Sequence, residues 1–325
     1  MVGNCAMKRK KAYIMDKIIY KIIPALFLAF LLIFSSGPVS ADQKMIGVIM
    51  TGSIPYYKDI HRSFTESLAT VGLGPGNAEI VLQSPTPEPM SWTNAARKLV
   101  AIGSDVIISY GAPATISAMA ETSDIPIVFA GVFDPQALGI TGKNATGISS
   151  KVPIASLIKN FKGIVNFSKL GVVVNDAERD TLLQAGEVKK LEAAFGFHSV
   201  RFNIRRAADT PKIANVDALF LTTGCAAMHC VNNIIGLARK EKIPSAATIG
   251  GGETSGVIIT IAADPGEQGR EAARMAAKVI KGAKPSSLPV EQPKKIDMII
   301  NLKEATAMGL KVPFELLTSA TKVIK

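Results

Sequence analysis

The 325-residue chain has few of the residues on which enzymes, metal centres and disulfide-stabilised domains depend. It holds three cysteines and three histidines, and its aromatic content is 6%. His61 and His198 do not follow predicted strands, and no G-x-S-x-G motif occurs, so a nucleophile–base pair lacks its usual signature. We therefore expect a protein that is not an enzyme and needs no cofactor.

The cysteines do not indicate a disulfide framework or a metal site. Cys5 lies in the leading segment, and Cys225 and Cys230 are five apart in "GCAAMHC". That spacing along a helix suits a disulfide poorly, and Cys225, His229 and Cys230 cannot all face one ion. Two buried free thiols are our preferred interpretation, with a disulfide as the alternative in an oxidising compartment.

Residues 1–41 have the pattern of a secretory signal. Six basic residues precede or flank an apolar run from Ile22 to Phe34, and Val39-Ser40-Ala41 matches the small-x-small cleavage rule. The run is short for a bilayer span and no second one follows, so we expect cleavage after Ala41 and a periplasmic protein. A membrane anchor is the alternative, and Met1, Met7 and Met15 are all candidate starts.

Charge gives no sign of a nucleic-acid partner. The formal net charge of the chain is +11, and it falls to +6 when residues 1–41 are left out. The remaining lysines are scattered and aromatic residues are few, whereas nucleic-acid-binding surfaces concentrate both. We expect no nucleic-acid partner.

From residue 44 onward, apolar strand-like runs alternate with helical patterns. Such alternation, with strands that are apolar throughout, predicts parallel sheets covered on both faces. The predicted strands are 44–51, 78–83, 106–110, 125–133, 170–175, 198–204, 216–222 and 257–261, and the predicted helices are 56–71, 90–102, 114–121, 154–165, 182–195, 226–240 and 265–281.

The alternation occurs in two series of roughly 100 residues each, which predicts two similar α/β lobes. We expect the chain to cross between them at Ser149-Ser150 and again at Ala262-Ala263-Asp264, and a strand and short helix in the C-terminal tail to return to the second lobe. The predicted N-terminal lobe comprises 42–149 with 264–296, and the C-terminal lobe 150–263 with 297–325.

Small polar residues and glycines follow the predicted strands. Ligands of open α/β sheets bind outside the carboxyl ends of the strands, where helix N-termini also offer free N–H groups. We therefore predict a ligand-binding set at these ends. It comprises Gly52, Ser53, Tyr56, Gly111, Ala112, Thr115, Asp134, Ser149, Asn175, Thr223, Gly224 and Asp264.

Two acids in this set allow two interpretations. Asp134 and Asp264 each end a predicted strand and are each followed by a proline. A carboxylate at that position caps the next helix, or faces the cleft and holds a cationic group of the ligand. For Asp134, whose strand is apolar enough to be internal, we predict that it binds the ammonium of an amino acid.

Several stretches resemble a known family. The turn "GAKPSSLPVE", the strand end "INLKEA" and the helix start "GLKVP" are similar to those of the periplasmic substrate-binding proteins of ABC transporters, in the branch that binds tryptophan and other amino acids. The resemblance covers most of residues 45–325. One departure follows the strand "DALFLT", where the family usually carries an Asp or similar polar residue and this chain has Thr222-Thr223-Gly224-Cys225.

The resemblance implies a type I periplasmic-binding-protein fold, with two lobes joined by three strands and a small molecule clamped between them. It also implies a membrane permease and an ATPase as partners of a monomeric protein. Tyr56 and Tyr57 either stack on an aromatic ligand or pack the first helix. The alternative function is a periplasmic sensing subunit that docks on a membrane receptor.

Overall fold

The computed structural model describes residues 43–142 and 144–325, so the predicted signal segment lies outside the described residues. Residues 44–325 form one compact unit. In the described part of the chain, no helix has the length and apolar character required to cross a membrane. The predicted alternation of strands and helices is confirmed, and it builds two separate sheets.

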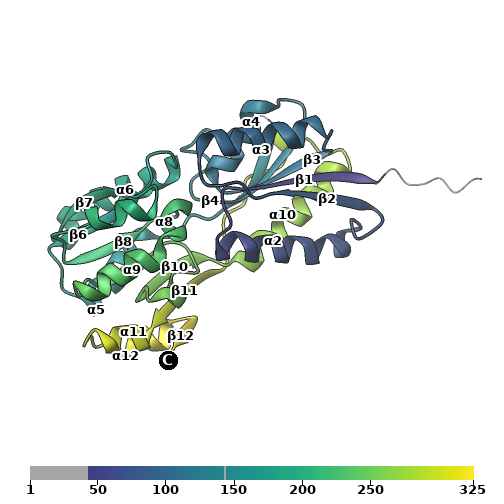
Figure 1. The fold of residues 1–325 in the computed structure, drawn as a ribbon. Helices are drawn as coiled ribbons and strands as arrows, with labels where there is room; N and C mark the ends of the chain where they lie inside the picture. Colours follow the sequence, from purple (N-terminus) through teal and green to yellow (C-terminus); the bar gives the residue numbers. More distant parts are fainter. Residues whose placement is uncertain (1–42, 143) are drawn as a thin grey trace, which may run out of the picture. The chain divides into compact units, whose positions relative to one another are not determined.

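The first sheet has five parallel strands in the order β2-β1-β3-β4-β5 (Figure 1). Strands β3, β4 and β5 are buried along their whole length, as expected for apolar runs covered on both faces. The strands are β1 (Lys44–Met50), β2 (Ala78–Gln83), β3 (Val106–Tyr110), β4 (Ile127–Val132) and β5 (Ala145–Ser149).

Four helices cover this sheet, α3 and α4 on one face and α2 and α10 on the other (Figure 1). Helix α10 comes from late in the sequence, yet its alanines share one apolar cluster with Ile60 and Phe64 of α2. The helices are α2 (Pro55–Leu68), α3 (Pro89–Ala101), α4 (Ala112–Glu121) and α10 (Pro265–Ile280), with short 3-10 turns η1 (Ala69–Val71) and η4 (Pro285–Ser287).

The second sheet has seven strands in the order β12-β11-β10-β9-β8-β6-β7. Only the β10–β11 pair is antiparallel, because the chain returns to this sheet from the first lobe after α10. The strands are β6 (Lys169–Val174), β7 (His198–Asn203), β8 (Ala218–Leu221), β9 (Ser245–Ala247), β10 (Ile259–Ala263), β11 (Ile296–Asn301) and β12 (Lys322–Ile324).

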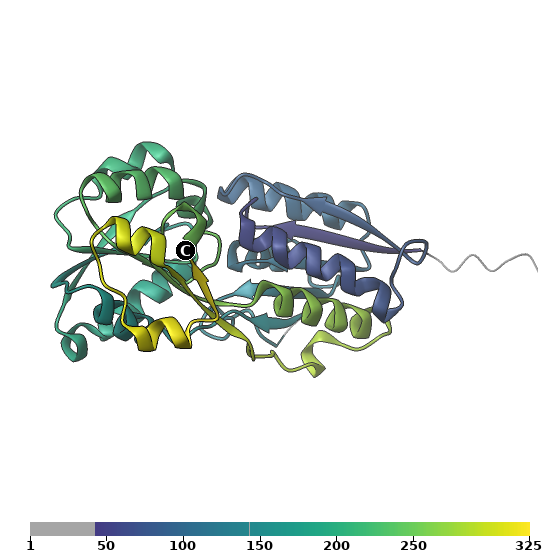
Figure 2. The same ribbon diagram turned by 90° about the horizontal axis from the view of Figure 1, so that it is seen from below.

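Helices around the second sheet differ from the prediction in two places. The expected helix 226–240 is interrupted at Cys230, where ψ is near 7°, and the expected helix 182–195 begins earlier and is interrupted at Leu191. The tail returns to this sheet, as Figure 2 shows. The elements are α5 (Ile154–Ile164), α6 (Arg179–Lys190), α7 (Glu192–Phe195), α8 (Cys225–His229), α9 (Val231–Lys240), α11 (Leu302–Ala307) and α12 (Phe314–Ser319), with η2 (Ala207–Lys212) and η3 (Glu253–Ser255).

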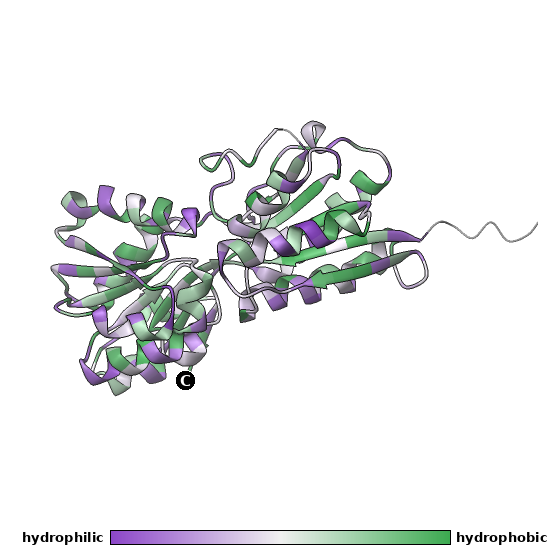
Figure 3. Cartoon of the chain, turned by 45° about the horizontal axis from the view of Figure 1, so that its top comes forward, coloured by the Kyte–Doolittle hydropathy of each residue, from purple (hydrophilic) through white to green (hydrophobic). Residues whose placement is uncertain are grey.

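Three segments connect the sheets: the chain after β5, the junction between β10 and α10, and the stretch before β11. The sheet strands are predominantly apolar and the outer helix faces polar (Figure 3). The isolated bridge between Ile148 and Glu291 joins the end of β5 to the connection before β11. We keep the predicted lobe limits as a proposal, which the membership of the two sheets supports.

Candidate functional site

Two strands of the first sheet end beside each other, and we call residues 51–57 and 111–115 the first-sheet edge. Strands β1 and β3 are neighbours in the sheet. Thr51 Oγ1 donates to the carbonyl of Tyr110 at 2.8 Å and accepts from the Ala114 N–H at 3.3 Å. The end of β1 is thereby tied to the first turn of α4.

Position 111 at this edge requires glycine. Its φ is +88°, and an added Cβ would collide with Tyr57 Oη and Thr51 Oγ1. The chain therefore turns sharply from β3 into α4 directly beneath Tyr57. Thr115 fixes the turn, because its hydroxyl donates to the Gly111 carbonyl at 2.8 Å.

Neither helix that starts at the first-sheet edge is capped by the side chain of its own N-cap residue, although the Ala114 N–H of α4 donates to Thr51 Oγ1. Ile54 and Gly111 occupy the N-cap positions of α2 and α4, and neither helix has a side-chain cap bond there. Uncapped N-terminal N–H groups carry partial positive charge. This edge therefore suits an anionic group such as a carboxylate.

The corresponding edge of the second sheet is formed by residues 175–184, 222–225 and 248, which we call the second-sheet edge. Glu178 is buried there, and its carboxylate accepts from Asn175 Nδ2 and the Cys225 N–H, both at 2.8 Å, and from the Ala226 N–H at 3.2 Å. Burial raises the pKa of Glu178 although these hydrogen bonds lower it. Glu178 therefore joins the end of β6 to the start of α8.

Asp180 belongs to a second buried network at this edge. Gln184 Nε2 donates to Thr223 Oγ1 at 2.6 Å, and Thr223 Oγ1 donates to Asp180 Oδ2 at 3.2 Å. Thr248 donates its hydroxyl to Gln184 Oε1. Asp180 is 1% exposed, and its Oδ1 has no hydrogen-bond partner among the described residues. Burial, and then the nearby Glu178 carboxylate, raise the pKa of Asp180 to about 7.

The two edges meet. A Cβ added at Gly52 would collide with Cys225 Sγ and come within 3.1 Å of His229 Cε1. Tyr57 is also buried at this junction, and its pKa is raised well above the ordinary value by burial and then by the Asp180 carboxylate. Carboxyl ends of strands from both sheets thus face each other, as the sequence predicted for a cleft.

The other predicted residues of these edges differ in exposure and in their contacts. Ser53 is exposed just before α2, whereas Ala112 is buried in the first turn of α4 and Gly224 just before α8. Asn175 binds Glu178 and also lines a cavity of about 1100 Å³ with Pro87 and Arg201. Tyr56 is buried, and its Oη lacks a hydrogen-bond partner within the described ranges.

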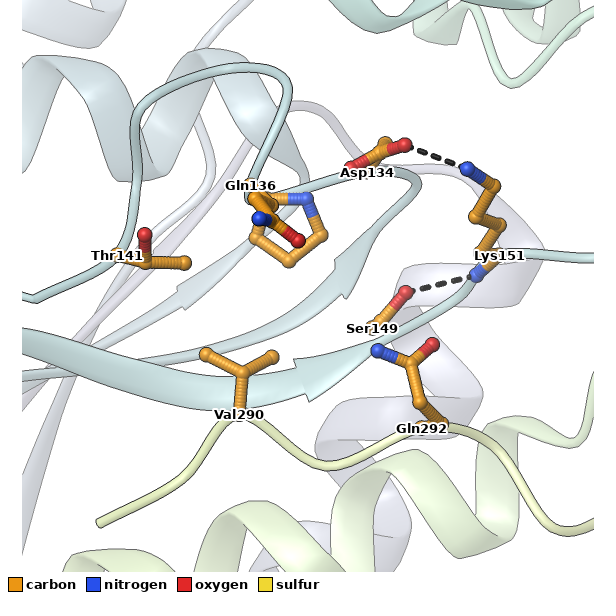
Figure 4. A pocket seen from close by; sticks show the side chains of 8 residues that line it. Asp134, Gln136, Thr141, Ser149, Lys151, Val290 and Gln292 are labelled. Atoms are coloured by element: carbon orange, nitrogen blue, oxygen red, sulfur yellow. Dashed lines mark hydrogen bonds and ion pairs between the residues drawn. The ribbon is translucent and has the colours of Figure 1, made fainter.

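Asp134 and Ser149 lie together at a different cavity, of about 410 Å³ (Figure 4). Residues 135–139 form a turn and not a helix, so the interpretation of Asp134 as a helix cap is wrong. Asp134 Oδ1 accepts from the Ala137 N–H of this turn at 3.0 Å, and Oδ2 pairs with Lys151 Nζ at 2.6 Å. Burial raises the pKa of Asp134, but the hydrogen bonds from Lys151 and the backbone outweigh it and hold that pKa below its ordinary value. Ser149 donates to the Phe133 carbonyl at 2.9 Å.

Asp264 occupies a helix-capping position. Its Oδ1 accepts from the Glu267 N–H at 2.6 Å, and its Oδ2 pairs with Lys295 Nζ at 3.1 Å. Of the two interpretations of this acid, the cap of α10 is therefore present in the structure.

The structure also shows the cysteines and the arrangement of the residue types that bind metal ions. Cys225 and Cys230 are both free and buried, which confirms the preferred interpretation of the cysteines. No group of three or more His, Cys, Asp or Glu residues that could hold a metal ion occurs in residues 43–142 and 144–325.

Sequence reasoning missed several buried residues of the site, namely Tyr57 as a contact between the edges, Glu178, Asp180, Gln184 and Thr248. A signal was present in "NDAERDT", residues 175–181, where acids follow a strand end closely. An acid in the first turn of a helix is common, however, because it interacts favourably with the helix dipole. The pattern alone does not separate that role from a buried site.

The comparisons with known proteins identify one family through a family model and one fold through solved structures. The family model described as ABC transporter substrate binding protein matches residues 45–324. A tyrosine-binding protein of Clostridioides difficile is 23% identical over 285 residues, which cover 84% of this chain and 83% of that protein.

Two solved structures share the fold with a TM-score of 0.83, and in each case 87% of this chain and 100% of the other are covered. One is a conserved domain protein from Vibrio cholerae, 24% identical, and the other is an ABC domain from Streptococcus pneumoniae in complex with L-Trp, 23% identical. The predicted family, the predicted two-lobed α/β fold and the expectation that the chain is no enzyme are confirmed by these relatives.

Proposed function

The chain belongs to the family of ABC transporter substrate-binding proteins, and from this premise we propose that it binds an amino acid or a related compound between its lobes and delivers it to a membrane permease. The observation that carries this proposal is the pair of facing edges. One offers uncapped helix N-termini, and the other holds a buried carboxylate with an open oxygen. A ligand with a carboxylate and an ammonium group matches both.

The ligand class also draws support from relatives. A tyrosine-binding protein and an L-Trp complex are both similar to this chain. Tyr56 and Tyr57 are buried beside the first-sheet edge, with ring centroids 5.8 Å apart, and place aromatic surface there. We propose an aromatic amino acid as the first ligand to test, with those predicted site residues that lie at the two edges as its contacts.

Binding is coupled to hinge closure in this proposal. The ligand stabilises the closed arrangement because its two ends reach both edges only when the lobes are together. Small-angle scattering should therefore give a smaller radius of gyration for the ligand-bound protein than for the free protein. An unchanged profile at saturation would count against closure.

The proposed function also specifies where the protein acts and which proteins it works with. The protein acts outside the cytoplasm in the periplasm as a monomer, after removal of residues 1–41, and its partners are a permease and an ATPase. N-terminal sequencing of the exported protein should begin at Asp42. A mature protein that still contains residues 22–34 would contradict this.

The proposed ligand class is tested by titration calorimetry of the mature protein with L-tryptophan and L-tyrosine, with D-glucose as the control. We expect saturable binding of at least one amino acid and none of the sugar. At 100 times its dissociation constant, the ligand should stabilise the fold by about 2.7 kcal/mol in a thermal melt. Binding of the sugar but of neither amino acid would refute the proposed class.

A further inference from the structure

We propose that Asp180 binds the protonated amino group of the ligand through its Oδ1 oxygen. This inference rests on the proposed function and names the residue and the ligand group that give the site its charge selectivity. If the inference is correct, a ligand must carry an amino group to bind tightly.

The first observation is that Asp180 differs from the other acids that follow strands. Both oxygens of Asp134, Asp176, Asp264 and Glu178 are occupied by N–H donors. Asp180 accepts the Thr223 hydroxyl at Oδ2, while its Oδ1 is buried without a partner among the described residues. A buried acceptor without a donor is destabilising, so its presence calls for a donor that arrives with a ligand.

The second observation is the position of Asp180. Its partner Thr223 lies two residues before Cys225, whose sulfur abuts Gly52 of the opposite lobe. Its charge also acts on Tyr57, which extends from that lobe. Asp180 is therefore buried where the two edges meet, and a ligand held by the uncapped N-terminus of α4 would lie beside it.

The third observation is that the residues around Asp180 are buried and hydrogen-bonded to one another. Gln184, Thr223 and Thr248 are each less than 5% exposed and form a continuous chain of hydrogen bonds that ends at Asp180. This chain orients the carboxylate without neutralising its charge, because all its members are neutral. A buried carboxylate held in this way favours a cationic donor over a neutral one.

The proton balance of binding follows from the neighbouring groups. The titratable groups that act on Asp180 or its neighbours are Glu178 on the same segment, Tyr57 on α2, and Cys225 and His229 on α8. Tyr57 and Cys225 have raised pKa values and are neutral at pH 7. When the ammonium binds, a protonated Asp180 releases its proton to solvent and the ammonium keeps its own.

The test compares amino acids with analogues that lack the amine. L-Tryptophan and indole-3-propanoate, and L-tyrosine and 3-(4-hydroxyphenyl)propanoate, are titrated into wild type, Asp180→Asn and a control, Glu304→Gln. Glu304 is another buried acid of the same lobe, and it is paired with Arg239 away from both edges. We expect Asp180→Asn to weaken amino-acid binding about 10- to 150-fold, and Glu304→Gln to bind like wild type.

The analogues give the second readout. We expect them to bind wild type more weakly than the amino acids do, and Asp180→Asn to bind them no more weakly than wild type does. Equal amino-acid affinity of wild type and Asp180→Asn, in a variant shown to be folded by circular dichroism, would overturn the inference but leave the proposed function. A wild type that binds neither amino acid would overturn the proposed ligand class and the inference together.

Discussion

The two edges that face each other are built from different chemistry. The first-sheet edge contains no acid in residues 51–57 or 111–115, and it presents helix N-termini and tyrosine rings. The second-sheet edge contains two buried acids, of which Glu178 is fully hydrogen-bonded and Asp180 is not. In the proposed function, recognition of the two ligand charges is therefore divided between the lobes.

This division explains how a small ligand favours closure. A zwitterion held by one lobe alone leaves one of its charged ends without a partner. When the lobes meet, the carboxylate lies at helix N-termini and the ammonium at Asp180, so the ligand prefers the closed state. The second-sheet edge is less stable without a ligand because it keeps a charged group partly unsatisfied.

Among changes that leave Asp180 in place, the largest expected effect comes from separating the edges. In Gly52→Ala, the added Cβ meets Cys225 Sγ, and overpacking of this kind costs about 1–3 kcal/mol, which corresponds to roughly a 5- to 150-fold loss of affinity. Titration calorimetry with L-tryptophan or L-tyrosine measures it. Gly186→Ala on the exposed side of α6, where a Cβ meets nothing within 4 Å, is the control and should keep the wild-type affinity. Equal affinity in both variants would show that the edges do not close on each other.

Removing the charge of the second-sheet edge should stabilise the ligand-free protein. Because the pKa of Asp180 is raised to about 7 in the folded state, the folded protein binds the proton more tightly, and stability falls as pH rises from about 4 to about 7. Asp180→Asn should lose this dependence. At pH 8 it should gain about 1–3 kcal/mol in the free energy of unfolding, as measured by denaturant titration. A destabilised Asp180→Asn at pH 8 would mean that the open oxygen has a partner in the free protein.

The smallest effect is expected at Asp134, outside both edges. Asp134→Ala removes a backbone acceptor and the partner of Lys151, which should cost about 1 kcal/mol of stability. Since the pKa of Asp134 is lowered, this contribution is present at neutral pH and lost in acid as pH falls through that pKa. Thermal melts at pH 7 and at acidic pH measure it. A 10- to 150-fold loss of amino-acid affinity in Asp134→Ala would instead support its predicted role as the ammonium partner.

Much of the fold follows from the sequence because the strands are continuous apolar runs bounded by glycine, proline and polar residues. The strands it missed are not long apolar runs: β5 is Ala-Thr-Gly-Ile-Ser, β9 is Ser-Ala-Ala and β12 spans three residues, too few to establish a period. Strand β11 was expected, but its antiparallel pairing depends on the return of the chain from the first lobe, a long-range property.

The site was predicted less completely, for a physical reason. The strand ends led to the prediction of Gly52, Gly111 and Thr223, because glycines and small polar residues mark these ends locally. Asp180 becomes a site residue only through its contact with Thr223, which is 43 residues away in the sequence. Its carboxylate contacts Thr223, at the strand end where the chain departs from the family pattern, and it comes from helix α6.

The role proposed for Asp180 is best tested by the pH dependence of amino-acid affinity. If the ammonium binds ionised Asp180, the dissociation constant of wild type should rise about tenfold for each pH unit below about 7 and stay constant above it, and Asp180→Asn should show a flat profile between pH 5.5 and 8. Calorimetry in two buffers of different ionisation enthalpy should also detect close to one proton released per ligand by wild type at pH 6, and none by the variant. A flat wild-type profile, or the same slope in Asp180→Asn, would contradict the account.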